Sequence, residues 1–319
     1  GTYFDKVQRM RKLGGMISDE LLISKEKVEL SASICKTDLT SDLVGEFPEL
    51  QGIMGGHFAL HQGFDKDISL AITEQYLPIG PDSKIPKKLF SVALSITDKI
   101  DTLVGFFGIN EKPTSSKDPF ALRRIALGII RTIIENKKEL KVKDLLNYSS
   151  GLYQDQGIIF INQDLFKDLN NFLKDRFRYY LKEKQIRLDI VDATISSFSL
   201  NKLYSSFNKA HKLNQIIDSQ TGIDIISSYK RASNILDSEI KNNEIEITNT
   251  TDPGIFKTDF EKNLFKKINE IKKYYSNINN DEDYQQSLLM LASAKQEIFD
   301  FFDNVKVNEE NEVLKKNRL

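Results

Sequence analysis

The sequence predicts an all-α protein made of two helical domains. Apolar residues recur at the three- and four-residue steps of amphipathic helices almost throughout the chain, and the alternating patterns of strands are nearly absent. The 319 residues, of which 40% are hydrophobic, suffice for two cores of ordinary size. The sequence has neither a membrane-spanning apolar run nor a signal peptide, so we expect a cytoplasmic protein without a membrane segment.

The first part of the chain predicts several helices separated by prolines. Apolar residues at three-residue steps from Phe4 to Leu13 indicate a helix at the amino terminus. Asp118 followed by Pro119 is typical of an N-cap and a first helical residue, and predicts a helix that ends near Asn136. Proline removes a backbone donor and clashes with the preceding turn, so the helical pattern is interrupted at Pro48, at Pro78 to Pro86 and at Pro113.

The polar stretch 137–156 predicts the passage between domains, which places the two domains at 1–140 and 141–319. The run Ile158 to Ile161 is the one strand-like stretch, and it fits a buried loop equally well. Thr221 and Asp224 have the spacing of a capping box at the start of a helix. Helices are expected over 164–184, 199–213, 222–240, about 257–275 and 284–302, and would form a bundle.

The residue types limit the chemistry of the chain. The single cysteine, Cys35, allows no internal disulfide and too few thiolates for a structural zinc site. There are three histidines, His57, His61 and His211, and no glycine-rich phosphate loop, dinucleotide fingerprint or nucleophile elbow. No motif for ATP binding is evident.

Charge is unevenly distributed along the sequence. The formal net charge is −1, which argues against binding nucleic acid by bulk electrostatics. Residues 166–231 nevertheless carry 12 basic and 7 acidic side chains, whereas residues 232–319 carry 12 and 17. This asymmetry weakly favours a polyanionic partner, and ordinary solvated helix faces explain it equally well.

Four runs in the sequence closely resemble one family, the beta subunit of bacterial two-chain (alpha2 beta2) glycyl-tRNA synthetase. They are KTDLTSDLVGEFPELQGIMGGHFALHQG (Lys36 to Gly63), EQYLP (Glu74 to Pro78), DKIDTLVGFFGINEKPTSSKDPFALRR (Asp98 to Arg124) and SYKRASNIL (Ser228 to Leu236). The runs follow the order of the family and spread over most of the chain. Because the sequence starts with Gly1 and stops in a charged run, we expect a C-terminal fragment of that subunit.

The resemblance implies the fold and the role of each part. Residues 1–140 would be an HD-like helical domain, and residues 141–319 a linker and a helical anticodon-binding domain of the arginyl-tRNA synthetase type. The chain would bind glycine tRNA and contain no catalytic residue and no cofactor. The complete enzyme would use ATP and Mg through its alpha subunit, with which this chain would assemble as alpha2 beta2.

The HD-like resemblance also points to a former metal site. His57 and His61 lie four apart on an expected helix and point the same way, and Asp98 on a later helix is a further ligand type. Gln62 stands where an HD pair needs aspartate, and an amide is a poor substitute. The prediction is a vestigial site of His57, His61 and Asp98 that holds no metal. The alternative is a metal-dependent HD-type phosphohydrolase, and a third class is a helical protein-interaction scaffold.

Three further interpretations concern side chains on the expected helices and the loops between them. Asp98 and Asp101 share a helix face and could form a catalytic carboxylate pair, but a structural pair on a solvated helix is favoured. Tyr229, Ala232 and Leu236 are expected to face the core. Cationic, aromatic and amide side chains suit phosphates and unpaired bases, so the candidate tRNA-binding residues are Lys112, Lys117, Arg123, Arg124, Arg176, Arg178, Lys182, Lys230, Arg231 and Asn234.

Overall fold

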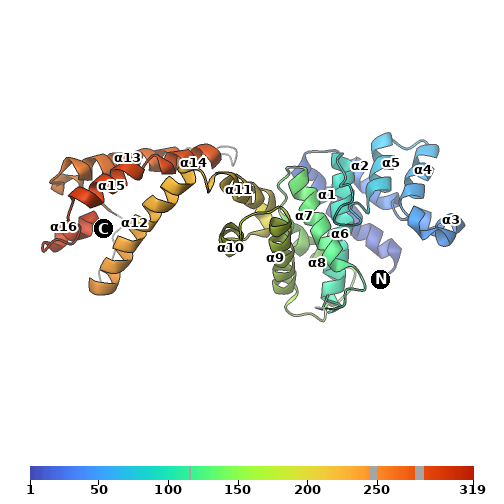
Figure 1. Ribbon diagram of the computed structural model, residues 1–319. Coiled ribbons are helices and arrows are strands. Elements are labelled where there is room, and N and C mark those ends of the chain that lie inside the picture. Colours follow the sequence, from blue (N-terminus) through green and yellow to red (C-terminus); the bar gives the residue numbers. More distant parts are fainter. Residues whose placement is uncertain (115, 244–249, 277–283) are drawn as a thin grey trace. The chain divides into compact units, whose positions relative to one another are not determined.

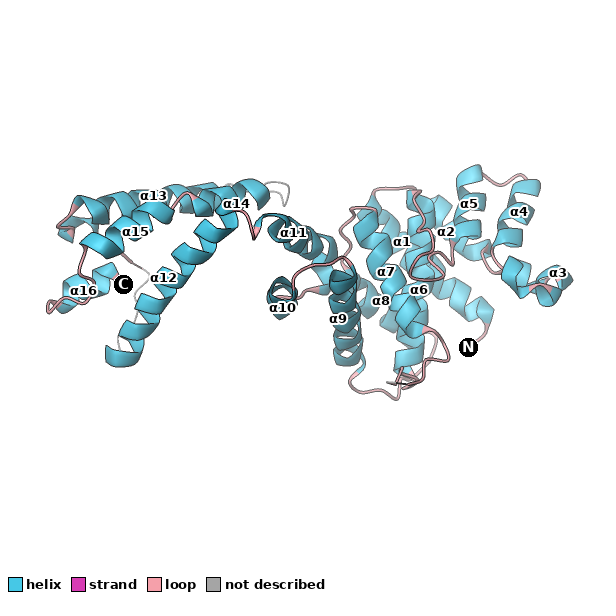
Figure 2. Cartoon of the chain, in the orientation of Figure 1, coloured by secondary structure: helices cyan, strands magenta, loops and turns pink. Residues whose placement is uncertain are grey.

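The computed structural model describes residues 1–114, 116–243, 250–276 and 284–319, with the side chains of 240–243 left out. Over these residues the chain consists of helices and contains no strand, which confirms the all-α prediction (Figure 1, Figure 2). The helices form two compact units, Gly1–Phe207 and Asn208–Leu319. None of the described helices is both long enough and apolar enough to cross a membrane.

Among the described residues, ten α-helices lie wholly within the first unit, and α11 (Leu203–Ile216) continues from it into the second. They are α1 (Tyr3–Leu21), α2 (Lys25–Ile34), α3 (Asp42–Glu46), α4 (Ile53–His61), α5 (Lys66–Glu74), α6 (Leu89–Gly108), α7 (Leu122–Glu135), α8 (Val142–Asp155), α9 (Leu165–Glu183) and α10 (Leu188–Ser196). Short 3₁₀ helices cover Thr37–Thr40, Pro48–Leu50 and Leu200–Lys202.

Helix α6 is the centre of the first unit. It packs against α1, α2, α5, α7, α8 and α9, and residues on all its sides are buried. An apolar surface all round is typical of a helix in the middle of a core. The buried residues of α6 also include charged ones, among them Asp98, Lys99 and Asp101, and a buried charge is costly unless it is paired. The interior of the first unit therefore requires partners for these charges.

Gly56 allows α4 and α5 to pack closely. A Cβ atom at this position would lie 1.9 Å from Thr73 Oγ1 and 2.6 Å from the backbone oxygen of Ser69, both on α5. The inner face of α4 is accordingly made of the small residues Gly55, Gly56 and Ala59. Larger side chains of α4 are left on its outer side.

The start of α7 differs from the prediction. The helix begins at Leu122 rather than at Pro119, because Ala121 adopts a left-handed conformation with φ of 54°. The Asp118 carboxylate still caps the helix, and accepts hydrogen bonds from the backbone N–H groups of Leu122 (2.8 Å) and Arg123 (3.0 Å). The predicted end is confirmed, since α7 stops at Glu135 with Asn136 as its C-cap.

The predicted linker at 137–156 is wrong. Residues 142–155 form α8, which packs against α1 and α6 and buries Val142, Leu145 and Leu152. The many polar residues of this stretch hid apolar positions at helical steps. The units divide between Phe207 and Asn208, whereas the sequence placed the domain boundary at 140/141.

The run after α8 is neither a strand nor a buried loop. The Ile159 and Ile161 side chains are 88% and 65% exposed. The backbone N–H groups of Ile161 and Asn162 donate to the oxygen of Gly108 at 3.0 and 3.1 Å, at the end of α6. The loop therefore closes the last turn of α6 while Ile159 and Ile161 face outward.

The second unit contains α12 (Gln220–Asn243), α13 (Asp259–Ser276), α14 (Tyr284–Ala292), α15 (Lys295–Asn304) and α16 (Glu312–Arg318), with a 3₁₀ turn at Pro253–Ile255. The single helix expected over 284–302 is wrong, because Ser293 and Ala294 separate α14 from α15. Thr221 lies inside the first turn of α12 and does not precede it. Both α12 and α13 pack against α14 and α15.

A buried ion pair holds the start of α13 to α16. Thr258 Oγ1 accepts from the N–H of Glu261 at 3.3 Å and Glu261 Oε2 accepts from the N–H of Thr258 at 2.7 Å, which is a capping box. The other carboxylate oxygen of Glu261 lies 2.7 Å from Arg318 Nε, with both side chains at most 4% exposed. Burial raises the pKa of Glu261, but the hydrogen bond from Arg318 and those of the cap together lower this pKa by more, so the net shift is downward.

Candidate functional site

The structure does not assemble the predicted vestigial metal site. His57, His61 and Gln62 are exposed, because the small residues of α4 occupy its inner face. Asp98 is buried on α6 and its carboxylate is bound by Lys36. Among the described residues no group of three or more His, Cys, Asp or Glu side chains could hold a metal ion. The resemblance of this unit to the HD fold stays a prediction.

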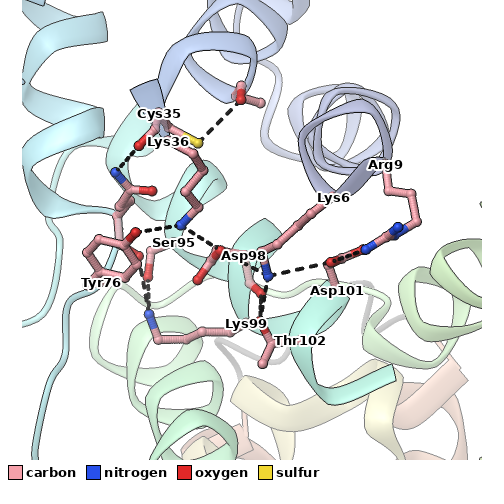
Figure 3. A network of polar contacts seen from close by, with 12 residues as sticks. Lys6, Arg9, Cys35, Lys36, Tyr76, Ser95, Asp98, Lys99, Asp101 and Thr102 are labelled. Carbon is pink, nitrogen blue, oxygen red and sulfur yellow. Dashed lines mark hydrogen bonds and ion pairs between the residues drawn. The ribbon is translucent and has the colours of Figure 1, made fainter. Parts of the chain in front are cut away.

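A continuous polar network instead joins α6 to α1 and to the end of α2 (Figure 3). Asp98 Oδ1 lies 2.9 Å from Lys36 Nζ and 3.2 Å from Lys6 Nζ. Lys6 Nζ continues to Asp101 Oδ2 at 3.5 Å, and Arg9 Nε donates to Asp101 Oδ1 at 2.7 Å. Acidic side chains of α6 thus alternate with basic side chains from α1 and from the segment after α2.

The network neutralises charges that burial would otherwise make unfavourable. Burial raises the pKa of Asp98, but the ammonium groups of Lys36 and Lys6 lower it more, and the net shift is far downward. Burial lowers the pKa of Lys36, and the Asp98 carboxylate reverses this and raises it. Asp98 and Asp101 therefore act as a structural pair, as the sequence favoured, but they are buried and ion-paired rather than solvated.

Lys99 differs from the other cations of this region. Its side chain donates to the oxygen of Leu77 at 2.7 Å and to Ser95 Oγ at 2.8 Å, with the oxygen of Gln75 at 3.4 Å. The residue is 4% exposed, and this burial lowers the pKa of Lys99 to about 7 although Asp98 opposes the shift. The acceptors of Lys99 are neutral, so its ammonium charge is only partly compensated.

The network forms one wall of a cavity in the first unit. The cavity has a volume of about 500 Å³ and is lined by residues of α1, α6 and α7 and of the segments after α2 and α5. Its charged lining consists of four basic residues and one acidic residue, namely Lys6, Lys36, Lys99, Arg124 and Asp98. Tyr3, Phe106 and Ile125 give it an apolar side.

Of the candidate tRNA-binding residues before and on α7, two are bound to other residues of the chain and two have free side chains. Lys112 Nζ lies 2.5 Å from Asp168 Oδ2, and Arg123 donates to the backbone oxygen of Thr114. Lys117 and Arg124 are exposed, and neither side chain forms an ion pair or hydrogen bond with any residue that the structure describes. These two cations are available to a ligand.

The candidates on α9 were expected in the anticodon-binding part at 141–319, and the structure places them in the first unit. Arg178 Nη1 pairs with Asp192 Oδ1 at 2.5 Å. Arg176 is half-buried and its guanidinium lies 5.8 Å from the ring centre of Tyr179. Lys182 is exposed and has no partner among the described residues.

Helix α12 presents a mixed face in the second unit. Lys230 and Asn234 are exposed, whereas Arg231 is half-buried, paired with Asp303 and 4.6 Å from the ring centre of Phe299. Tyr229 is 71% exposed, so the expectation that it faces the core is wrong. Polar Ser233 and Asp237, at four-residue steps from Tyr229, are the sequence signal for this exposure.

The second unit defines the class of protein. Residues 225–319 match the family model described as DALR anticodon binding domain, so this part of the chain is an anticodon-binding domain. Residues 1–196 match the model described as Glycyl-tRNA synthetase beta subunit. The chain belongs to the glycyl-tRNA synthetase beta subunit family.

Curated relatives agree with the family models. The chain is 38% identical over 320 residues to the glycine–tRNA ligase beta subunit of Rickettsia canadensis and 35% identical over 323 residues to that of Paracoccus denitrificans. It is 34% identical over 323 residues to the beta subunit of Rhodospirillum centenum. Each match covers all of this chain and 45% of the relative, so the chain spans less than half the length of these relatives.

Proposed function

We propose that this chain is the tRNA-binding portion of a glycyl-tRNA synthetase beta subunit, which supports the ATP-dependent attachment of glycine to its tRNA in the complete enzyme. The proposed partners are glycine tRNA and the alpha subunit, in an alpha2 beta2 assembly in the cytoplasm. ATP and Mg would be used by the alpha subunit, and this chain would contribute no catalytic residue. Membership of the family and the anticodon-binding domain support this role.

The exposed face of α12 is the observation that supports tRNA binding most directly. Tyr229, Lys230 and Asn234 are exposed on this helix, and their side chains have no partner among the described residues. A tyrosine ring can stack on an unpaired base, an ammonium group binds a phosphate, and an amide can hydrogen-bond to a base edge. Free side chains of these three types on one helix suit the exposed bases of an anticodon loop.

A titration with glycine tRNA tests the role of this face. We expect Tyr229→Ala to weaken binding about tenfold or more, because stacking on one base contributes about 1–3 kcal/mol. Lys230→Gln should weaken binding and reduce its salt dependence by the equivalent of about one phosphate contact. Lys266→Gln, at an exposed position of α13 without a described partner, is the control. Equal affinities of all four proteins would remove α12 from the interface.

The assignment of chemistry has a separate test. The purified chain should not catalyse glycine-dependent exchange of pyrophosphate into ATP, and the alpha subunit should be needed for this exchange. Exchange by this chain alone would refute the proposal that activation takes place in the alpha subunit.

A further inference from the structure

We propose that the cavity of the first unit, bounded by α1, α6 and α7, binds a phosphate group that is presented either by a free nucleotide or by the backbone of RNA. The inference rests on the charge, the free donors and the size of this cavity. It does not depend on the role proposed for α12, because it concerns another unit of the chain.

The first argument is an excess of positive charge. Lys6, Lys36, Lys99 and Arg124 line the cavity, and Asp98 is the one acidic residue among the described residues that line it. Asp98 pairs with both Lys36 and Lys6, and Asp101 pairs with Lys6 and Arg9, so two carboxylates are shared among three cations. Charges that are partly removed from water interact more strongly than charges in bulk solvent. An anion in the cavity would therefore compensate the positive charge that Asp98 and Asp101 leave over.

The second argument is the state of Arg124. Its guanidinium group forms no ion pair and no hydrogen bond with the described residues, although it lines the cavity. The adjacent Arg123 is bound to the backbone oxygen of Thr114 and lies 4.0 Å from an oxygen of Asp118. Neighbouring arginines on one helix thus differ, and the one that lines the cavity keeps its donors free. A guanidinium fork matches the oxygen atoms of a phosphate.

A third argument is a hydroxyl group with an unused proton. Tyr76 Oη accepts a hydrogen bond from Lys36 Nζ at 2.8 Å and another from Gln51 Nε2. Its own O–H is thus left to donate, and no described residue accepts from it. Burial raises the pKa of Tyr76 to about 12, so the hydroxyl keeps its proton at neutral pH. Tyr76 and Arg124 both line the cavity and both can donate to an anion.

The size and the apolar side of the cavity indicate a nucleotide rather than a bare phosphate ion. A volume of about 500 Å³ lies within the range of about 300–1,000 Å³ that is typical of small-molecule sites. Tyr3, Phe106 and Ile125 supply apolar surface on which a base or a ribose could lie. The ligand would place its phosphate against the basic wall and its base against this surface.

The experiment titrates the whole chain with inorganic phosphate, with adenosine 5′-monophosphate and with tRNA, in separate calorimetric series. Arg124→Gln is the test variant, since its exposed side chain has no partner to lose. Lys117→Gln is the matched control, because Lys117 is also exposed and free but does not line the cavity. Losing a hydrogen-bonded charge should raise the dissociation constant of the ligand about ten- to hundredfold in Arg124→Gln. Tyr76→Phe should give a smaller loss.

The three titrations separate the two sources of the phosphate group. Weaker binding of adenosine 5′-monophosphate by Arg124→Gln, with the control unchanged, identifies a free nucleotide. If neither small ligand binds, a loss of tRNA affinity specific to Arg124→Gln identifies the RNA backbone. The proposal is overturned if Arg124→Gln and Lys117→Gln behave alike in every series. Binding of the nucleotide without binding of tRNA would support the phosphate site in this cavity and refute only the proposed tRNA function.

Discussion

Substitution of Lys36 by methionine tests how far the buried network stabilises the first unit. The Lys36 side chain is 5% exposed and its partner Asp98 is 12% exposed. Removal of Lys36 leaves Asp98 with Lys6 alone, at 3.2 Å. Removing one partner of a buried ion pair typically costs about 3–5 kcal/mol, and the remaining Lys6 places the expected cost near the lower limit, about 3 kcal/mol. In a unit of this size such a loss lowers the Tm by about 6–12 °C.

Hydrogen exchange of the whole chain, followed on peptides from α6, measures this loss without a contribution from the second unit. The matched variants are Asp98→Asn and the double variant with both changes. Because the two residues are in contact, the sum of the losses in the two single variants should exceed the loss in the double variant by about 1–3 kcal/mol. If Lys36→Met cost less than about 1 kcal/mol, the pair would resemble a surface ion pair and the reasoning would be refuted.

The pH dependence of the stability of the same variants tests the direction in which the pKa of Asp98 is shifted. The pKa of Asp98 is lowered in the folded protein, where the ammonium groups outweigh the effect of burial. The unfolded chain therefore binds the proton first as the pH falls. The stability that Asp98 provides relative to Asp98→Asn should be complete above about pH 5, where even the unfolded carboxyl is ionised. It should decline below about pH 4 and vanish only when the folded carboxyl is protonated.

Three further predictions concern other contacts. Gly105→Ala would place a Cβ atom 2.3 Å from Tyr153 Oη and should destabilise the first unit by about 1–3 kcal/mol, whereas Gly151→Ala, with nothing within 4 Å, should leave its Tm unchanged or raise it. Glu261→Gln leaves the buried guanidinium of Arg318 with Glu309 at 3.2 Å as its remaining carboxylate, and should cost the second unit about 3 kcal/mol in urea unfolding. Arg231→Ala should cost about 1 kcal/mol through lost packing on a ring, so its tRNA affinity must be compared at a temperature where both proteins are folded.

Local signals in the sequence predicted the helices well where caps and apolar periods agree. The helix expected over 164–184 is α9, with Asp164 and Lys184 as its flanking residues. Competing local preferences caused the misses. Ala121 in the left-handed region moves the start of α7 from Pro119 to Leu122. In α8 the buried apolar positions are separated by many polar residues, and this stretch was therefore predicted to be a linker.

The site depends on contacts between distant parts of the chain, which a single sequence does not specify. Lys36, Asp98 and Arg124 all lie in runs that carry the family resemblance, but nothing in those runs indicates that they line one cavity. The sequence also cannot show that Arg123 is bound to the backbone oxygen of Thr114 while the side chain of Arg124 has no partner among the described residues. His57 and His61 were correctly placed on a helix, and the small residues opposite them decided which side of that helix is buried.

The contact between Glu261 and Arg318 has a practical consequence for handling the protein. Arg318 is adjacent to Leu319, and its guanidinium is held in the interior by Glu261 and Glu309. Proteolysis on the amino-terminal side of Arg318 would leave the Glu261 carboxylate without its cation at the first turn of α13. Preparations nicked there should lose the fold of the second unit first, and mass spectrometry of the intact chain would identify them before any binding assay.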